Sequence, residues 1–425
     1  MLNDLKETAL VVAALMKLDD DKFVDRCYRV LLNRSPDTTG YNYYLGRLRS
    51  GFSKKSIIKD IATNKQEPSK LKKIKIALFL GKACCNHGAI MKYEASIAVI
   101  IPFYNGMNFL WRALESVKNQ TMQPKEVIVV DDGSENDESS ACRRLVENFG
   151  YIYVKKINGG QGSARNYGVK ISSAEFVCFL DQDDYYLPEH NELLFSEILL
   201  DKFGFVYGDV AEGDEQGCIV RSGMVKEHSD HPKTSLFECL RRDMFILPGA
   251  VMINRVAFLS VNGFDERLRG YEDDDLFLRM FREGYKNSFL NKTVSVWCIN
   301  EGSTSYTIKM GRSRMIYFAK LLADYPEKKF LSINYPKDLV IPRFLPWFIT
   351  DALKGVILDN EYAHEYVSIL SDVIDLSQPF LSEEETARLR TILSWCLAGR
   401  NVLVNSLYFS RLAENWGFIQ TFYDK

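Results

Sequence analysis

The feature that most constrains this chain of 425 residues is an acidic stretch that directly follows an apolar run. Residues 176–180 form a short, uninterrupted apolar run, which predicts a short buried strand. Asp181, Asp183 and Asp184 follow at once. Carboxylates at the end of a buried strand repel one another and lose hydration, so they require compensation. A hard divalent cation such as Mg²⁺ would provide it, and so would a solvated turn that caps the next helix. The stretch alone does not decide between the two.

Composition narrows the class of protein. The net charge is −2 with 26% charged residues, so nothing in the charge balance indicates a nucleic-acid partner. Nine scattered cysteines without a Cys-x-x-Cys pair argue against a zinc cluster or a disulfide framework, and favour reduced thiols in a cytoplasm. The length predicts two or three domains.

We expect neither a signal peptide nor a membrane-spanning helix. The apolar residues 9–16 follow Asp4 and Glu7 instead of a basic start. The apolar run 339–358 is interrupted by three charged residues and two prolines. Core packing is favoured for this run over a partner interface, a helical lid on a neighbouring domain or contact with a membrane surface. We therefore predict a cytoplasmic protein, attached at most to the inner face of the membrane.

Changes in pattern predict the domain organisation. Apolar residues at helical spacing fill the N-terminal part, strands and helices alternate in the middle, and the remainder is helical with prolines as punctuation. We predict the following parts: a helical domain at 1–70, a connection at 71–93, an α/β domain at 94–311 and a helical region at 312–425.

Within the α/β part, polar motifs follow successive strands. A strand at 97–101, a helical face at 109–117 and a strand at 127–130 predict a βαβ unit with parallel strands. Ligands of such sheets bind beyond the carboxyl ends of the strands, so residues 102–105 and 131–134 should lie together. The glycine-rich residues 158–163 also allow close approach of a ligand, although they match no complete phosphate-binding motif. Further strands are predicted at 203–207, ending at Gly208-Asp209, and at 250–253 and 294–299, with a loop or irregular hairpin at 214–235.

A second acidic group opens an amphipathic helix. Glu272, Asp273, Asp274 and Asp275 are consecutive, and the helix dipole explains only one or two of them. We expect Asp275 to pair with Arg279 at i, i+4 and Asp274 to face solvent. Like-charge neighbours should raise the pKa of Asp273.

Taken together and in this order, the motifs of residues 96 to about 305 resemble a family-2 glycosyltransferase with the GT-A fold. The motifs are Pro102-Phe103-Tyr104-Asn105, Val129-Val130-Asp131-Asp132-Gly133-Ser134, Ala164-Arg165-Asn166, Leu180-Asp181-Gln182-Asp183-Asp184, Gly263-Phe264-Asp265-Glu266 and Glu272-Asp273. Residues 23–44 resemble a small domain of unknown function related to phycobilisome linkers, which implies a docking module. The fold class expected is therefore an α/β, Rossmann-like mixed sheet flanked by helices, with helical regions at both ends.

This resemblance implies inverting transfer of a sugar from a nucleoside diphosphate donor, usually a UDP-sugar, to an acceptor hydroxyl. On the donor side, Pro102 and Tyr104 would line the base pocket and Asp132 would accept a hydrogen bond from the base. Arg165 would lie near the diphosphate or hold the acidic loop, and Asp181 would contact the ribose or the metal.

The same resemblance implies roles for the remaining candidates. Asp183 would ligate Mn²⁺ or Mg²⁺ between the phosphates, Asp273 would be the general base, and Glu272 would bind substrate beside it. Many members carry a histidine ligand where Asn300 stands, and an amide oxygen is a weaker ligand for a hard cation.

Two other classes remain open from the sequence. A nucleotidyltransferase would normally carry a glycine-rich loop with Arg or Lys after its first strand, where this chain has residues 102–105. An inactive, transferase-like scaffold is disfavoured because Asp132, Asp183 and Asp273 are all present. By analogy, the acceptor expected is a glycan, lipid-linked or protein-linked molecule in bacterial surface polysaccharide or glycoprotein assembly.

Overall fold

The computed structural model describes residues 15–16, 18–32, 34–49, 54, 57–58, 61, 96–300, 307–325 and 333–404. The predicted connection at 71–93 lies outside these residues. The chain forms two compact units. The first comprises Met1–Lys233, Ile246–Gly263 and Met280–Ile299, and the second comprises Thr234–Phe245, Phe264–Arg279 and Asn300–Lys425.

The N-terminal part of the first unit is helical, as predicted. Helices α2 (Asp20–Leu32) and α3 (Thr38–Arg49) bury the apolar side chains that recur at helical spacing, among them Phe23 and Cys27. Asp37 precedes α3 and accepts a hydrogen bond from the Gly40 backbone N–H at 2.8 Å, which satisfies one of the donors left unpaired at a helix start.

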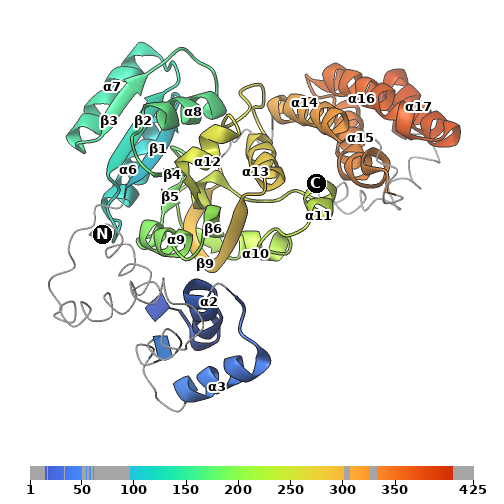
Figure 1. Cartoon of the computed structure of the whole chain (residues 1–425). Helices are drawn as coiled ribbons and strands as arrows, with labels where there is room; N and C mark the ends of the chain where they lie inside the picture. The colour runs from blue at the N-terminus through green and yellow to red at the C-terminus, as the bar shows by residue number, and fades with distance from the viewer. Residues whose placement is uncertain are drawn as a thin grey trace. The chain divides into compact units, whose positions relative to one another are not determined.

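A mixed sheet forms the centre of the first unit (Figure 1), and its strand order is β3-β2-β1-β4-β8-β6-β9-β5. β1 (Ile97–Phe103) lies between β2 (Glu126–Asp131) and β4 (Phe176–Phe179) and is parallel to both. β3 (Ile152–Lys155) continues the parallel half beyond β2, whereas β8 (Val251–Asn254) is antiparallel to β4. The predicted mixed α/β sheet is confirmed. Complete burial of β1 explains why its sequence is an uninterrupted apolar run.

The other half of the sheet corrects one prediction. β6 (Phe203–Gly213) does not end at Asp209 but continues beside β9 (Lys286–Cys298), with shifts in register around that residue. Asp209 is buried, and its carboxylate accepts hydrogen bonds from the backbone N–H groups of Val210 and Val225 at 2.9 Å each, which compensate for its loss of water. An acid satisfied in this way need not terminate a strand. The sheet is completed by β5 (Tyr185–Tyr186) and β7 (Ile219–Arg221), and α10 (Met224–His228) follows β7.

Helices cover this sheet. α8 (Gln161–Ile171) packs against β1 and β2, and α7 (Asn136–Asn148) packs against β3. A Cβ atom added at Gly168 would lie 2.3 Å from Ile100 Cγ2, so the close approach of α8 to β1 requires glycine. The remaining helices of this unit are α6 (Met107–Lys118), α9 (His190–Ile198) and α12 (Arg255–Ser260).

The second unit is helical. It comprises α11 (Leu236–Arg241), most of α13 (Glu272–Arg282), α14 (Ile308–Asp324), a wide helical turn at Pro336–Val340, α15 (Ile341–Ile357), α16 (Ala363–Ser377), α17 (Glu383–Ala398) and α18 (Arg400–Val404). α15 buries Phe344, Phe348 and Ile349, so the apolar run 339–358 packs in a core as predicted. None of the helices in the described ranges combines the length and apolar character that a membrane crossing requires.

Candidate functional site

The predicted site residues belong to both compact units. The first unit contains Pro102, Tyr104, Asp132, Arg165, Asp181 and Asp183, and the second contains Glu272, Asp273 and Asn300. Asn300 is half-buried. Its role as a ligand of the same cation as Asp183 stays a prediction.

In the first unit, the carboxyl ends of β1, β2 and β4 meet at one edge of the sheet. Pro102 is buried in β1 opposite Val130, and the Tyr104 side chain just beyond the strand is 50% exposed. The Tyr104 backbone N–H donates to Gln182 Oε1 at 2.8 Å, and Gln182 Nε2 donates back to the Tyr104 carbonyl at 3.3 Å. Gln182 thus ties the end of β1 to the acidic stretch after β4. The sequence pattern does not single out Gln182, because its partner Tyr104 is 78 residues away.

The two aspartates after β2 have different surroundings. Asp131 is fully buried and accepts hydrogen bonds from Ser134 N (2.8 Å), Ser139 Oγ (2.5 Å) and Tyr153 Oη (2.6 Å). Burial alone would raise the pKa of Asp131, but these hydrogen bonds outweigh it and lower the pKa. Asp131 therefore fixes the turn as a structural carboxylate.

Asp132 is held by the glycine-rich stretch. Its carboxylate accepts hydrogen bonds from the backbone N–H groups of Gly159 (2.9 Å) and Gly160 (2.6 Å). Lys156 Nζ lies 2.8 Å from the same carboxylate. The structure thus brings together two predicted elements, the acid after β2 and the glycine-rich stretch before α8. Lys156 was missed, although its position directly before that stretch was a usable signal.

An ion pair holds the first residue of the acidic stretch. Arg165 in α8 is 1% exposed, and its Nη2 lies 2.5 Å from Asp181 Oδ1. Burial of an arginine is costly without a carboxylate partner, so this pair fixes the position of Asp181 relative to α8. The Asp181 side chain keeps 35% of its surface exposed at the edge of the sheet.

The other two acids of the stretch differ in burial. Asp184 is buried and accepts a hydrogen bond from Cys298 N at 2.8 Å. Burial, with Asp183 and Asp181 nearby, raises the pKa of Asp184 well above its ordinary value. Asp183 is half-buried, and its backbone carbonyl accepts a hydrogen bond from Arg112 Nη2 at 2.6 Å.

The set of oxygen donors fits one kind of cation site. Within the described residues, no group of three or more His, Cys, Asp and Glu side chains is arranged to hold a metal ion. Mg²⁺ and similar hard cations are usually bound by one or two carboxylates together with substrate phosphates, not by a cage of protein ligands. The Asp183 carboxylate therefore fits a cation shared with a bound diphosphate.

In the second unit, Asp273 lies in the first turn of α13. It is half-buried, whereas Glu272, Asp274 and Asp275 are buried. Its Oδ1 accepts a hydrogen bond from the Asp274 backbone N–H at 2.8 Å. Burial, followed by repulsion from Glu272, Asp243 and Asp274, raises the pKa of Asp273 well above its ordinary value. The expected direction of this shift is confirmed.

Asp274 does not face solvent, and that prediction is wrong. It is 3% exposed, and its carboxylate accepts hydrogen bonds from Met244 N (2.7 Å), Tyr317 Oη (2.6 Å) and Arg343 Nη2 (2.7 Å). These partners are 30, 43 and 69 residues away in sequence, so helical periodicity within α13 could not indicate them.

Asp275 pairs with Arg279 at 2.6 Å, as predicted. Its carboxylate also forms an ion pair with Lys320 Nζ at 2.6 Å, and the same Nζ lies 2.9 Å from Asp265 Oδ2. Asp265 receives two hydrogen bonds from the Arg267 side chain and one from its backbone N–H, and these bonds together with Lys320 lower the pKa of Asp265. The turn before α13 is therefore fixed to α14.

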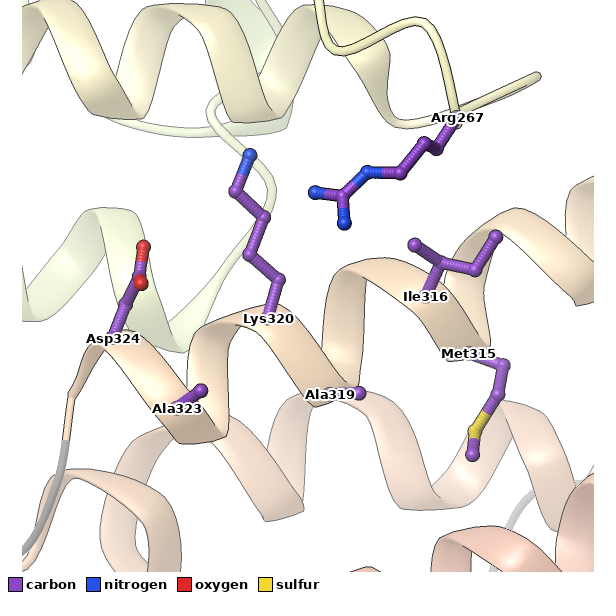
Figure 2. Close-up of a pocket in the computed structure, with 7 residues that line it drawn as sticks. All are labelled: Arg267, Met315, Ile316, Ala319, Lys320, Ala323 and Asp324. Carbon is purple, nitrogen blue, oxygen red and sulfur yellow. The ribbon is translucent and has the colours of Figure 1, made fainter.

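A shallow groove lies along α14 in the second unit (Figure 2). Its volume is about 470 Å³, and it is lined by Arg267, Met315, Ile316, Ala319, Lys320, Ala323 and Asp324. Both of its cations pair with Asp265, and Lys320 also pairs with Asp275, so their charge is largely balanced. This balance gives no electrostatic argument for an anion site in the groove.

Three known protein families match parts of this chain. The family description "Glycosyl transferase family 2" matches residues 98–259. A domain of unknown function (DUF4214) matches residues 11–66, and "N-terminal domain of galactosyltransferase" matches residues 237–300.

Similar proteins include an uncharacterized glycosyltransferase of Rickettsia typhi, 32% identical over 45% of this chain and 60% of that protein. The glycosyltransferase GlyA of Streptococcus pneumoniae is 27% identical over 51% of this chain and 32% of that protein. A crystal structure of S. aureus TarS 1–349 in complex with UDP-GlcNAc is 21% identical, covers 72% of this chain and 88% of that one, and has a TM-score of 0.51. The chain spans from 26% to 60% of the length of the first five curated relatives.

Proposed function

Because residues 98–259 form a glycosyl transferase family 2 domain, we propose that this chain is an inverting glycosyltransferase that uses a nucleoside diphosphate sugar. The observation that carries the proposal is the meeting of Asp132, Asp181 and Asp183 at the carboxyl ends of the parallel strands β1, β2 and β4. UDP is the nucleotide we favour, and the complex of TarS with UDP-GlcNAc supports testing that donor first.

In this proposal the first unit binds the donor. Tyr104 and Pro102 line the base pocket, Asp132 accepts a hydrogen bond from the base, and Asp181 contacts the ribose. Lys156 and Arg165 contribute indirectly, because they hold the carboxylates of Asp132 and Asp181 in place. Such an arrangement orients the donor before the acceptor arrives.

The proposal includes a divalent cation bound together with the diphosphate of the donor. Asp183 would hold Mn²⁺ or Mg²⁺, with Asn300 as a further oxygen donor. When bound, the cation neutralises the charge that develops on the departing diphosphate.

The second unit supplies the base. The acceptor hydroxyl oxygen forms a bond to the anomeric carbon as the bond from that carbon to the diphosphate oxygen breaks. Asp273 takes the hydroxyl proton, the nucleoside diphosphate leaves with the electron pair, and the configuration at the anomeric carbon inverts. A raised pKa suits a carboxylate that must accept a proton in this step. Glu272, buried next to Asp273, binds substrate through its carboxylate in this proposal.

For the acceptor, the proposal names a class of molecule and not a single compound. We propose a glycan, lipid-linked or protein-linked acceptor met at the cytoplasmic side of a membrane, with the N-terminal helices as a docking module. A role in surface polysaccharide or glycoprotein assembly follows by analogy.

A screen tests this function directly. UDP-GlcNAc, UDP-glucose, UDP-galactose, GDP-mannose and UTP are added with and without Mn²⁺, and thermal stability and product release are measured. We expect one nucleotide sugar to raise the melting temperature and to yield nucleoside diphosphate, and Asp183→Ala to lose the dependence on Mn²⁺. Pyrophosphate release from UTP would instead identify a nucleotidyltransferase. Lack of stabilisation by any of these compounds would contradict the proposal.

A further inference from the structure

The C-terminal helices α14 and α15 hold the residue next to the proposed base. Tyr317 Oη and Arg343 Nη2 both donate to Asp274 Oδ2, at 2.6 and 2.7 Å, and the Met244 backbone N–H donates to Oδ1 at 2.7 Å. The side chains of Arg343 and Asp274 are only 6% and 1% exposed. The first turn of α13 is therefore fixed from outside that helix.

Arg343 is itself placed with little freedom. Its guanidinium lies 4.6 Å from the centre of the Phe344 ring and 5.8 Å from that of Tyr317. Its Nη1 donates to the Cys239 carbonyl at 3.0 Å, and its Nη2 lies 3.9 Å from Asp243 Oδ2. A planar, desolvated guanidinium held by a carboxylate, a carbonyl and two rings cannot be replaced conservatively by lysine.

Arg343 offsets part of the negative charge around Asp273. Asp243 comes from the segment after α11, Glu272 and Asp274 come from α13, and Tyr317 comes from α14. Further out, Tyr271 accepts a hydrogen bond from Arg314, which also pairs with Asp351. Burial and repulsion by Asp274 raise the pKa of Asp243 to about 6, and Arg343 acts against this rise.

We propose that Arg343 is a positioning residue for the general base, because it fixes Asp274 beside Asp273 and its charge offsets the surrounding carboxylates. This inference rests on the proposed function, in which Asp273 takes the acceptor proton. It gives the C-terminal helices a part in catalysis through Arg343 and Tyr317, in addition to their packing role. Without the positive charge of Arg343, Asp273 would be protonated over a wider pH range and would be unable to act as a base near neutrality.

The test is the pH dependence of kcat/KM for release of UDP from the UDP-sugar that the screen selects, with water as the acceptor. In Arg343→Met we expect the acidic limb of the profile to move up by about one pH unit, since a positive charge is lost from a desolvated cluster. In Arg343→Lys the limb should stay near its wild-type position while kcat falls. In Arg343→Met combined with Asp274→Asn, one charge of each sign is removed, and the limb should return towards wild type.

Donor affinity measured by calorimetry should stay within about twofold in all these variants, because the donor-binding groups lie in the first unit. Arg388→Met is the matched control, since this exposed arginine of α17 pairs with Glu384. An acidic limb that does not move in Arg343→Met would overturn the proposal, even if activity fell at every pH. If Arg343→Met does not fold, the lysine variant and the double variant decide, and an acidic limb that moves up by about one pH unit in either of them would overturn the proposal. An active Asp273→Asn would overturn the assignment of the base itself. An inactive Asp273→Asn, together with an acidic limb that does not move in Arg343→Met, would overturn only the role of Arg343.

Discussion

The two compact units hold their acidic residues in different ways. In the first, Asp131 and Asp132 are satisfied mainly by donors within about 30 residues of them, including the backbone N–H groups of Ser134, Gly159 and Gly160. In the second, Asp274 depends on Tyr317 and Arg343, which lie 43 and 69 residues away. Asp131 and Asp132 are thus held by nearby turns, whereas Asp274, next to the proposed base, depends mainly on distant helices.

The comparison explains what the sequence could predict. The parallel strands, the turn after β2 and the pair of Asp275 with Arg279 were predictable, because a short stretch of sequence indicates each of them. The environment of Asp274 was not predictable, because its partners converge only in the folded chain. For the same reason, sequence reasoning missed Arg343, Gln182 and Arg112.

The extension of β6 was missed for a related reason. A polar residue at the end of an apolar run usually marks the end of a strand, but Asp209 is satisfied inside the sheet by Val225. Periodicity records the polarity of a side chain and does not record whether a partner is present.

The largest effect is expected from Asp183→Ala in the first unit. Loss of a hard oxygen ligand and of one negative charge should lower transfer by roughly 10³-fold or more, since a bound cation contributes several kcal/mol to stabilising the leaving group. The measurement is the initial rate of UDP release with Mn²⁺ and with EDTA. Wild-type protein that stays fully active in EDTA would contradict the cation's role. Asp375→Ala on the exposed surface of α16 is the control.

Asp274→Ala tests the difference between the units through stability. Arg343 would remain buried without its main partner, so the free energy of unfolding should fall by about 3–5 kcal/mol. Asp132→Ala, which removes an acid satisfied largely by local backbone donors, should cost about 1–3 kcal/mol. Urea denaturation of both variants provides the comparison. Equal losses would show that local and distant partners stabilise the two acids alike.

Asp243 gives the second unit a pH dependence. Its pKa is about 6 in the folded chain, above its ordinary value of 3.8, so the protonated form is favoured on folding. Its contribution therefore becomes less favourable to folding as pH rises from about 4 to about 6. Asp243→Asn should have a higher melting temperature than wild type at pH 7, and the difference should vanish below pH 4. A constant difference at all pH values would indicate a packing effect instead.

The smallest effect is expected for Arg26, which is in α2. Its Nη2 lies 2.8 Å from Glu197 Oε1, which also accepts a hydrogen bond from Ser288 at 2.6 Å. Since Ser288 continues to satisfy Glu197, Arg26→Met should lower the free energy of unfolding by only about 1 kcal/mol. Arg29→Met, which removes an exposed pair with Asp25, is the matched control. A loss of several kcal/mol would show that α2 is integral to the stability of the sheet.

The central claim is that the first unit binds the donor nucleotide and that the base lies in the second unit. Donor affinity by calorimetry, measured beside the rate of transfer for Asp132→Asn and Asp273→Asn, tests it most directly. We expect Asp132→Asn to weaken donor binding, whereas Asp273→Asn should bind donor as wild type does and lose roughly 10²-fold or more in rate. A variant Asp273→Asn that loses donor affinity, or that retains the wild-type rate, would contradict the claim.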